Sequence, residues 1–291
     1  MSSGAIDERD EAGRLVIRPA PTPAADGTLI ALTPQTAGWS YVGFELLALT
    51  PGVRADRDTA EREVCVVVIS GSADVASVHG DWPGIGGRPD PFGGLPDAAY
   101  LPPGTAFSVT GTGDGAEVGL CFAPARTGRA ARLLPAGGVS EEVRGSGGQQ
   151  RTVHPILMGP DDAEALLVTE TLTSGGRWSS YPPHKHDRDA LPEESYLEET
   201  YYHRIDPAQG FVVQRVYTED RSLDQTLTVG DGELVLVPRG YHPVGVPPGY
   251  SSYYLNVMAG PTRTWVFRND PDHEWLVAAP APPPDTERGP P

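Results

Sequence analysis

The stretch YPPHKHD, residues 181–187, places His184 and His186 two positions apart. In a β-strand alternate side chains lie on the same face, so both imidazoles would point to one side of a sheet. A carboxylate from the next strand and a histidine from a third strand could then complete a site for one divalent cation. Imidazole and carboxylate ligands suit zinc, manganese, iron or nickel, and such a set leaves coordination positions free for a substrate. The stretch therefore predicts a metal site, and we interpret the remaining chain as its β-sheet scaffold.

The run LEETYYHR, residues 197–204, supplies a carboxylate on a neighbouring strand. Counting by two, Glu199, Tyr201 and His203 share one face, whereas Glu198 points the other way and is the reserve ligand. His203 would look into the same cavity as the metal, either as a satisfied core histidine or in a catalytic or supporting role. With Tyr201 it is a candidate for the base that moves a proton, and the sequence does not rank the two.

The run PRGYHP, residues 238–243, adds a further histidine on a turn. Four of the seven histidines in the chain thus fall between residues 184 and 242. The candidate metal ligands are His184, His186, Glu199 and His242.

The strand predicted at residues 211–217 carries Arg215 and Tyr217 on one face. A buried arginine is costly unless it is paired, so Arg215 is either an internal ion pair or a bidentate grip on a substrate carboxylate. Arg239, beside the third histidine-bearing turn, is the reserve cation. Tyr217 and Tyr254 are the aromatic candidates for substrate binding, with core packing as the alternative.

The composition predicts an all-β protein. The 291 residues include 35 glycines and 31 prolines, which are scattered between short apolar runs such as VCVVVI at residues 64–69. Turn signals this frequent indicate many short strands and few long helices.

Two corners of similar sequence, LPPG at 101–104 and VPRG at 237–240, indicate a duplicated β-barrel. We expect a first barrel at residues 14–135 without metal ligands and a second at 136–277 that carries the metal site. A disordered, Pro-rich tail is expected at 278–291.

The charge balance limits the partners. There are 22 Lys and Arg against 39 Asp and Glu, a net charge of −17, so the surface would repel phosphate backbones and anionic lipid. Nucleic acid and membranes are therefore not expected, and an anionic substrate would need a local cation. Cys65 and Cys121 lie in apolar runs and are predicted to be buried free thiols, which fits a reducing cytoplasm. No signal peptide and no apolar run of ~20 residues is visible.

The motif set resembles the cupin superfamily: His184-x-His186, a strand glutamate, and Gly232-x5-Pro238-x-Gly240 followed by a histidine. Residues 179–260 are more closely similar to the 5-deoxy-glucuronate isomerase family of bacterial myo-inositol catabolism. The matching segments are SSYPPHKHD (179–187), LEETYYHR (197–204), QRVYT (214–218), PRGYHP (238–243) and YLNVMAG (254–260).

This resemblance implies a bicupin, with two jelly-roll barrels in one chain. It implies an aldose–ketose isomerase that converts 5-deoxy-glucuronate to 5-dehydro-2-deoxy-gluconate, and it gives the metal-ligand role to His184, His186, Glu199 and His242. One divalent transition metal, zinc or manganese first and iron or nickel as alternatives, would acidify the C–H beside the aldehyde and stabilise an enediolate. The substrate would be a small uronate, and a homo-oligomer is left open.

Two other hypotheses remain from the same motifs. An iron-loaded cupin oxygenase would use a similar ligand set. A non-enzymatic sugar-binding bicupin would need no catalytic base. Dioxygen uptake distinguishes the first, and the presence of a tightly held transition metal argues against the second.

Overall fold

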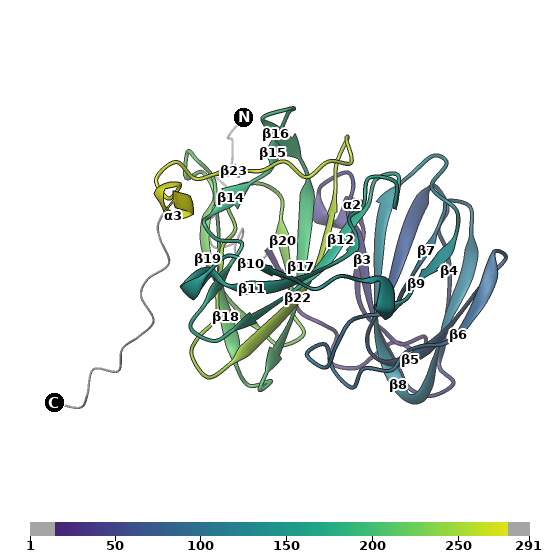
Figure 1. Ribbon diagram of the computed structural model, residues 1–291. Coiled ribbons are helices and arrows are strands. Elements are labelled where there is room, and N and C mark those ends of the chain that lie inside the picture. Colours follow the sequence, from purple (N-terminus) through teal and green to yellow (C-terminus); the bar gives the residue numbers. More distant parts are fainter. Residues whose placement is uncertain (1–14, 279–291) are drawn as a thin grey trace, which may run out of the picture.

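The computed structural model describes residues 15–278, which form two β-barrels side by side (Figure 1). The predicted all-β architecture is confirmed, because strands dominate and the helices are short. Residues 1–14 and the predicted disordered tail, from residue 279 on, lie outside the described residues. Ala278 is the last residue of helix α3.

The first barrel is an antiparallel sheet in the order β2-β3-β8-β5-β7-β9, with β4 paired to β8 and β6 paired to β5. Its strands are β2 Thr28–Leu32, β3 Gly43–Leu49, β4 Arg54–Asp58, β5 Arg62–Ser77, β6 Gly80–Gly86, β7 Ala98–Leu101, β8 Ala106–Pro124 and β9 Arg132–Leu134. The β-branched run at 64–69 lies in β5 and is completely buried, as its composition predicts. Its alternate residues Val64, Val66 and Val68 fill the barrel interior with apolar side chains.

The second barrel combines a seven-stranded sheet, β1-β20-β17-β22-β12-β11-β10, with a four-stranded sheet, β13-β21-β18-β19, and two short pairs, β14-β23 and β15-β16. The strands of the large sheet are β1 Val16–Ile17, β10 Glu142–Arg144, β11 Arg151–Leu157, β12 Leu167–Ser174, β17 Glu198–Asp206, β20 Leu234–Val237 and β22 Ser251–Ala259. The others are β13 Trp178–Ser179, β14 His184–Lys185, β15 Asp187–Ala190, β16 Glu194–Tyr196, β18 Phe211–Tyr217, β19 Asp224–Gly230, β21 Val244–Gly245 and β23 Arg268–Asn269.

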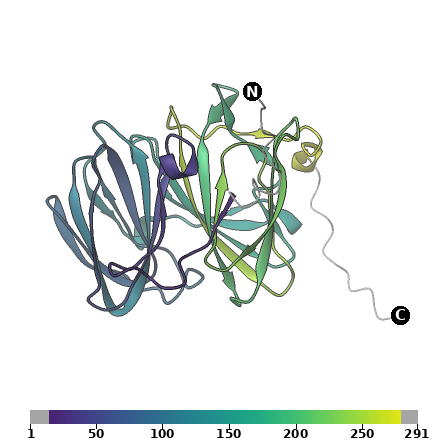
Figure 2. The same cartoon turned by 180° about the vertical axis from the view of Figure 1, so that it is seen from behind.

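The helical elements are short. They are α2 Pro34–Ala37, α3 Trp275–Ala278 and the 3-10 turns η1 Ala136–Gly138 and η2 Gly147–Gln149. Seen from behind, α2 lies where the two barrels meet (Figure 2). Within residues 15–278, no helix combines the length and apolar character that crossing a membrane requires.

Strand β1 belongs to the second barrel, because Val16 and Ile17 pair with β20. The unit expected at residues 14–135 places this strand in the first barrel instead. From β2 to β9 the strands pair within one sheet, and from β10 onward they pair in the other barrel. We retain the boundary between residues 135 and 136 as a proposal.

The largest apolar cluster lies between the barrels rather than inside either one. It joins residues of β3, β5 and β8 to residues of β12, β17 and β22, and the rings of Phe44 and Tyr202 stack across it at 5.8 Å. Gly119 permits this close approach, because a Cβ atom there would lie 2.9 Å from the Leu255 side chain. The interior of the second barrel has its own apolar cluster, separate from this interface.

The two barrels use the same strand register at corresponding corners. Val64 of β5 pairs with Leu101 of β7, which ends in the LPPG corner. Glu199 of β17 pairs with Val237 of β20, which ends in the VPRG corner. By this alignment the first barrel has a valine where the second has a glutamate, as expected for a duplicated unit of which one copy carries polar groups inside.

Candidate metal centre and active site

Three side chains converge inside the second barrel: His186, Glu199 and His242. Each offers one ligand atom, and these atoms all lie within 4.8 Å of one another. The Glu199 Oε2 atom is 3.1 Å from His186 Nε2 and 3.2 Å from His242 Nε2. All three side chains are buried. The strand parity that predicted Glu199 as an inward-facing carboxylate is thus what places it opposite the histidines.

The hydrogen bonds around the two histidines leave lone pairs aimed at the carboxylate. His186 Nδ1 donates to Leu197 O at 3.1 Å, and His242 Nδ1 donates to Gly240 O at 2.8 Å. In the neutral tautomer each Nε2 then carries a lone pair. Within residues 15–278 His242 Nε2 has no hydrogen-bond partner, and His186 Nε2 can meet Glu199 only if it is protonated or if a cation lies between them. Acceptors that face a carboxylate oxygen in a buried site need a cation between them. The donor set of two imidazoles and one carboxylate fits a divalent transition metal.

The carbonyl that accepts the hydrogen bond from His242 Nδ1 belongs to Gly240, a residue without a side chain. Its φ is +89°, and a Cβ atom would lie 2.4 Å from Tyr217 O. Only glycine fits so close to a neighbouring strand in the left-handed region. The VPRG corner therefore fixes the carbonyl that orients His242.

His184 lies beside this group, on β14. Its ring centroid is 5.1 Å from that of His242 and 6.5 Å from that of His186, and its Nδ1 lies 3.3 Å from Pro182 O. Burial lowers the pKa of His184 and of His242 to about 3. Burial also opposes protonation of His186, but the hydrogen bond and charge of Glu199 outweigh it and raise the pKa.

Glu198, the reserve ligand, points into the contact between the barrels. Its carboxylate accepts the backbone N–H groups of Ser40 and Tyr41, both at 2.7 Å, and of Val42 at 3.0 Å. These three hydrogen bonds are all with the first barrel, on the opposite face of β17 from Glu199.

Tyr201, His203 and Tyr254 lie deeper in the same barrel. The rings of Tyr201 and His203 stack at 6.0 Å, and Tyr254 contacts both. The Tyr201 hydroxyl is 3.0 Å from Ser180 Oγ, and burial raises its pKa well above the usual value, with the Glu199 charge adding to the effect.

His203 also has a partner that the sequence did not single out, Gln214. His203 Nε2 donates to Gln214 Oε1 at 3.0 Å, and His203 Nδ1 has no hydrogen-bond partner in the part of the chain that the structure describes. Burial lowers the pKa of His203 to about 4. Gln214 could have been found by strand parity, because Val212 and Val216 on the same face of β18 are buried.

That parity places Arg215 outside the barrel, where it forms an ion pair, one of the two roles that the sequence left open. Its guanidinium forms a bidentate pair with Asp224 at 2.7 and 2.8 Å, and both side chains are partly exposed. Tyr217 packs under Arg215 and donates its hydroxyl to Asp270 at 2.7 Å. Arg239 is exposed on the surface. The structure therefore brings none of these three to the metal-binding group.

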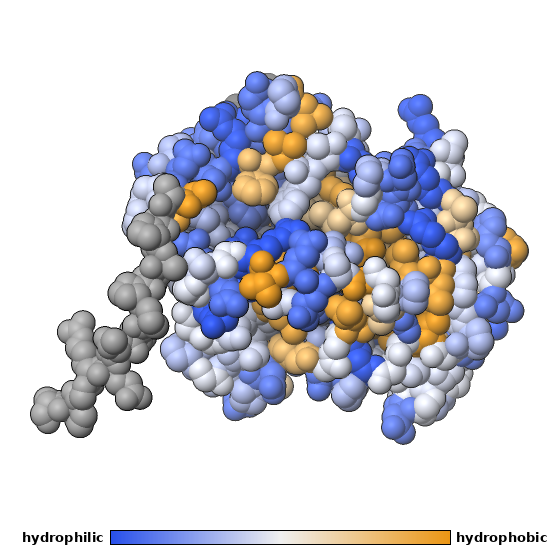
Figure 3. Space-filling model, viewed as in Figure 1, coloured by the Kyte–Doolittle hydropathy of each residue, from blue (hydrophilic) through white to orange (hydrophobic). Residues whose placement is uncertain are grey.

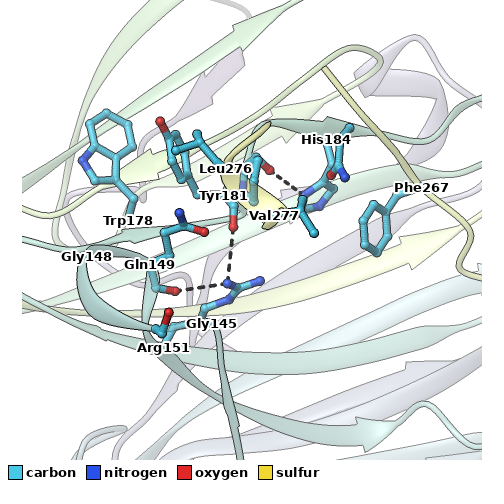
Figure 4. A pocket seen from close by; sticks show the side chains of 13 residues that line it. Gly145, Gly148, Gln149, Arg151, Trp178, Tyr181, His184, Phe267, Leu276 and Val277 are labelled. Atoms are coloured by element: carbon cyan, nitrogen blue, oxygen red, sulfur yellow. Dashed lines mark hydrogen bonds between the residues drawn. The ribbon is translucent and has the colours of Figure 1, made fainter. Parts of the chain in front are cut away.

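A cavity of about 570 Å³ opens beside His184 (Figure 4). Its walls include the aromatic side chains of Trp178, Tyr181 and Phe267, and α3 contributes Leu276. Arg151, at the start of β11, also lines it and was not identified from the sequence. Strand parity could not have shown that Arg151 lies at this cavity, because β11 and the segment around His184 come together only in the folded chain.

The fold and this site together define the class: the protein is a two-barrel cupin with a histidine–carboxylate group that could hold a metal in its second barrel. The chain belongs to the KduI/IolB family, whose model matches residues 16–276.

Named relatives match over most of their length. The chain is 51% identical over 257 residues to the 5-deoxy-glucuronate isomerase of Geobacillus thermodenitrificans strain NG80-2, covering 88% of this chain and 93% of the relative. It is 49% identical over 248 residues to the enzyme of that name from Bacillus subtilis strain 168, covering 84% and 91%.

Solved structures agree with this placement. An IolB-like protein from Salmonella typhimurium LT2 superposes with a TM-score of 0.87 at 42% identity, covering 90% of this chain and 99% of that one. The oxalate decarboxylase of Lactobacillus farciminis superposes with a TM-score of 0.64 at 12% identity, covering 91% and 90%. The second likeness concerns the bicupin fold alone.

Proposed function

We propose that this chain is a 5-deoxy-glucuronate isomerase, an aldose–ketose isomerase that forms 5-dehydro-2-deoxy-gluconate. The observation that carries the proposal is the convergence of His186, Glu199 and His242 beside a sugar-sized cavity. The relatives of that name, at about half identity over most of both chains, support the choice of substrate.

The proposed cofactor is one divalent cation held by His186, Glu199 and His242, with His184 as the fourth ligand. Zinc or manganese is the first choice, and iron or nickel would also suit these donors. When bound, such a cation would polarise the aldehyde oxygen and the neighbouring hydroxyl, which acidifies the C–H between them and stabilises an enediolate.

The chain's own residues must take a proton from C2 and deliver one to C1. We assign this transfer to Tyr201 and His203. Tyr201 lies beside Glu199, and its ring stacks on a neutral His203 that has a free lone pair on Nδ1. Tyr254 completes the aromatic wall behind them. The oxidation level of the substrate does not change overall, so no redox cofactor is required.

We also propose a cytoplasmic location, a small-molecule partner only, and a homo-oligomeric state. The free, buried thiols of Cys65 and Cys121 support a reducing compartment. Apolar side chains gather in a patch over the first barrel among mostly hydrophilic surface (Figure 3), which supports contact with a second copy.

The test is an NMR assay of purified protein, as isolated and after reconstitution with zinc or manganese, given 5-deoxy-glucuronate or glucuronate in parallel. We expect the aldose signals of 5-deoxy-glucuronate to be replaced by those of the ketose, and no dioxygen to be consumed. Chelation should abolish conversion and readdition of metal should restore it. Absence of conversion by the reconstituted protein, or oxygen uptake coupled to substrate loss, would reject the proposal.

A further inference from the structure

The cavity beside His184 contains one charged side chain, that of Arg151, among the described residues that line it. The other polar side chains on its walls are neutral ones such as Gln149 and Asn269, apart from the titratable His184. A chain with a net charge of −17 thus presents a cation at this particular opening. In Figure 4, Arg151 and His184 lie on different walls of the same cavity.

Arg151 has no carboxylate partner in the described part of the chain. Its Nη1 atom donates to Gln149 O at 3.1 Å and to Tyr181 O at 3.3 Å, and both acceptors are backbone carbonyls. A guanidinium has five N–H donors. These two contacts hold Nη1, and within residues 15–278 no hydrogen bond occupies the edge formed by Nε and Nη2, which suits a planar, bidentate anion.

The strand pairing places a second arginine beside Arg151. Arg144 of β10 lies directly opposite Arg151 of β11. Arg144 is neutralised by Glu142, which accepts from its Nε at 3.0 Å and from its Nη2 at 2.6 Å. Like charges in opposite positions destabilise a strand pair, and here only one of the two arginines has a compensating acid. Burial lowers the pKa of Arg151, and the Arg144 charge adds to this effect.

We propose that Arg151 binds the carboxylate of the substrate and orients its aldehyde end toward His184. This inference rests on the proposed function in one respect: the substrate is a uronate. An anion on the free guanidinium edge would supply the missing partner for a half-buried cation. The aromatic walls of the cavity would cover the C–H faces of the carbon chain between its two ends.

The experiment compares two ligands that differ only at C6. One is 5-deoxy-glucuronate, and the other is the neutral aldose with a CH2OH group in place of the carboxylate. Wild type, Arg151→Gln, Arg151→Lys and the matched control Arg144→Gln are compared by NMR turnover and by calorimetric binding. Thermal denaturation reports whether each variant is folded.

Loss of a bidentate charge-assisted contact predicts that Arg151→Gln lowers kcat/KM and affinity for the acid by about 10- to 150-fold. The values for the neutral aldose should change by less than about threefold, because that contact never forms. Arg151→Lys should recover part of the loss, since an ammonium keeps the charge but not the planar fork. Arg144→Gln should leave the preference for the acid as it is in the wild type.

Equal losses for the acid and the neutral aldose in Arg151→Gln would show that Arg151 only supports the fold, and would overturn the inference. An unchanged preference for the acid would overturn it as well. If the wild type does not turn over 5-deoxy-glucuronate, the proposed function fails, and calorimetry still decides on Arg151. A wild type that binds the acid no more tightly than the neutral aldose contradicts the inference directly.

Discussion

Two adjacent glutamates of β17 have different surroundings because consecutive strand residues face opposite sides of the sheet. Glu199 points into the second barrel, where it meets His186 and His242. Glu198 points into the interface, where it accepts three backbone N–H groups of the first barrel. We therefore expect position 199 to determine metal binding and position 198 to determine stability.

This separation gives a crossed prediction. Glu199→Gln should lower metal affinity by more than about 100-fold, because it removes the anionic ligand itself. Replacing a residue that only supports a ligand costs about 10- to 100-fold. Glu198→Gln should leave metal content unchanged and lower the free energy of unfolding by about 1–3 kcal/mol, since the amide puts an NH2 donor where a carboxylate oxygen accepts backbone N–H groups.

The measurements are elemental analysis and urea unfolding of both variants, each serving as the control for the other. Metal loss in Glu198→Gln with normal content in Glu199→Gln would reverse the ligand assignment.

The arginines show where sequence reasoning reaches its limit at this scale. Parity on one strand predicted that Arg215 and Tyr217 share a face, but not which face is the inner one. The interior positions of β18 are Val212, Gln214 and Val216, so Arg215 pairs with Asp224 outside. Arg151 reaches the cavity through the packing of β11 against the segment around Tyr181, and no local pattern contains that contact.

At the scale of elements, two carboxylates, one from each barrel, connect the barrels by hydrogen bonds. Glu63 of β5 accepts the backbone N–H groups of Glu164, Ala165 and Leu166 in the second half, at 2.7–2.9 Å. Glu198 of β17 makes the corresponding contacts with residues 40–42 of the first barrel. The reciprocal arrangement follows from the duplicated register, since each glutamate directly precedes the aligned residue, Val64 or Glu199.

The hairpin of β15 and β16 lies between His186 and Glu199 in the chain and holds the segment that carries the two histidines. Lys185 lies between the two histidines, and its side chain points away from them. Its ammonium binds Asp187 at 2.6 Å and Glu194 at 2.9 and 3.0 Å, and it is buried by β15 and β16. A buried lysine with two acids fixes the backbone on both sides of His186. The strand-period argument alone could not show this hairpin.

A third carboxylate, Glu164, makes stability depend on pH. The backbone N–H of Arg126 and those of Thr127 and Gly128 lower its pKa from 4.5 to about 2, against the effect of burial. Because the folded-state pKa is depressed, the group stabilises the fold above pH 4.5. This contribution is lost as the pH falls through about 2.

We therefore expect Glu164→Gln to be less stable than wild type at pH 7, with the difference shrinking as the pH is lowered below about 4.5. Urea unfolding at a series of pH values from 3 to 7 measures it, with the exposed Glu193→Gln as the control. A difference that stays constant across this range would show that the carboxylate charge is not responsible.

At the scale of the whole molecule, the fold is duplicated, and we propose that one copy carries the chemistry. In the first barrel the interior positions aligned with Glu199, Tyr201 and His203 are Val64, Val66 and Val68, which form a closed apolar core. The second barrel has the buried Glu199, Tyr201 and His203 at the same register, and a cavity opens beside His184. The first barrel thus contributes packing, through the large cluster between the barrels and the glutamate contacts.

Much of this plan was accessible from the sequence. The turn-rich composition, the repeated Pro-Gly corners and the strand parity of residues 199–203 depend on local rules, and the structure follows them. The pairing of β1 with the second barrel and the approach of Arg151 to His184 depend on long-range packing. The sequence contains no short-range signal for either, so both required the three-dimensional fold.

The central claim is that one divalent metal is bound in the second barrel by His186, Glu199 and His242. An anomalous-difference map from crystals of the purified protein, recorded at the absorption edge of its bound metal, tests this most directly. We predict one strong peak, about 2.0–2.3 Å from His186 Nε2, a Glu199 carboxylate oxygen and His242 Nε2. A peak inside the first barrel, or none at these three side chains in crystals of protein that contains stoichiometric metal, would contradict the account.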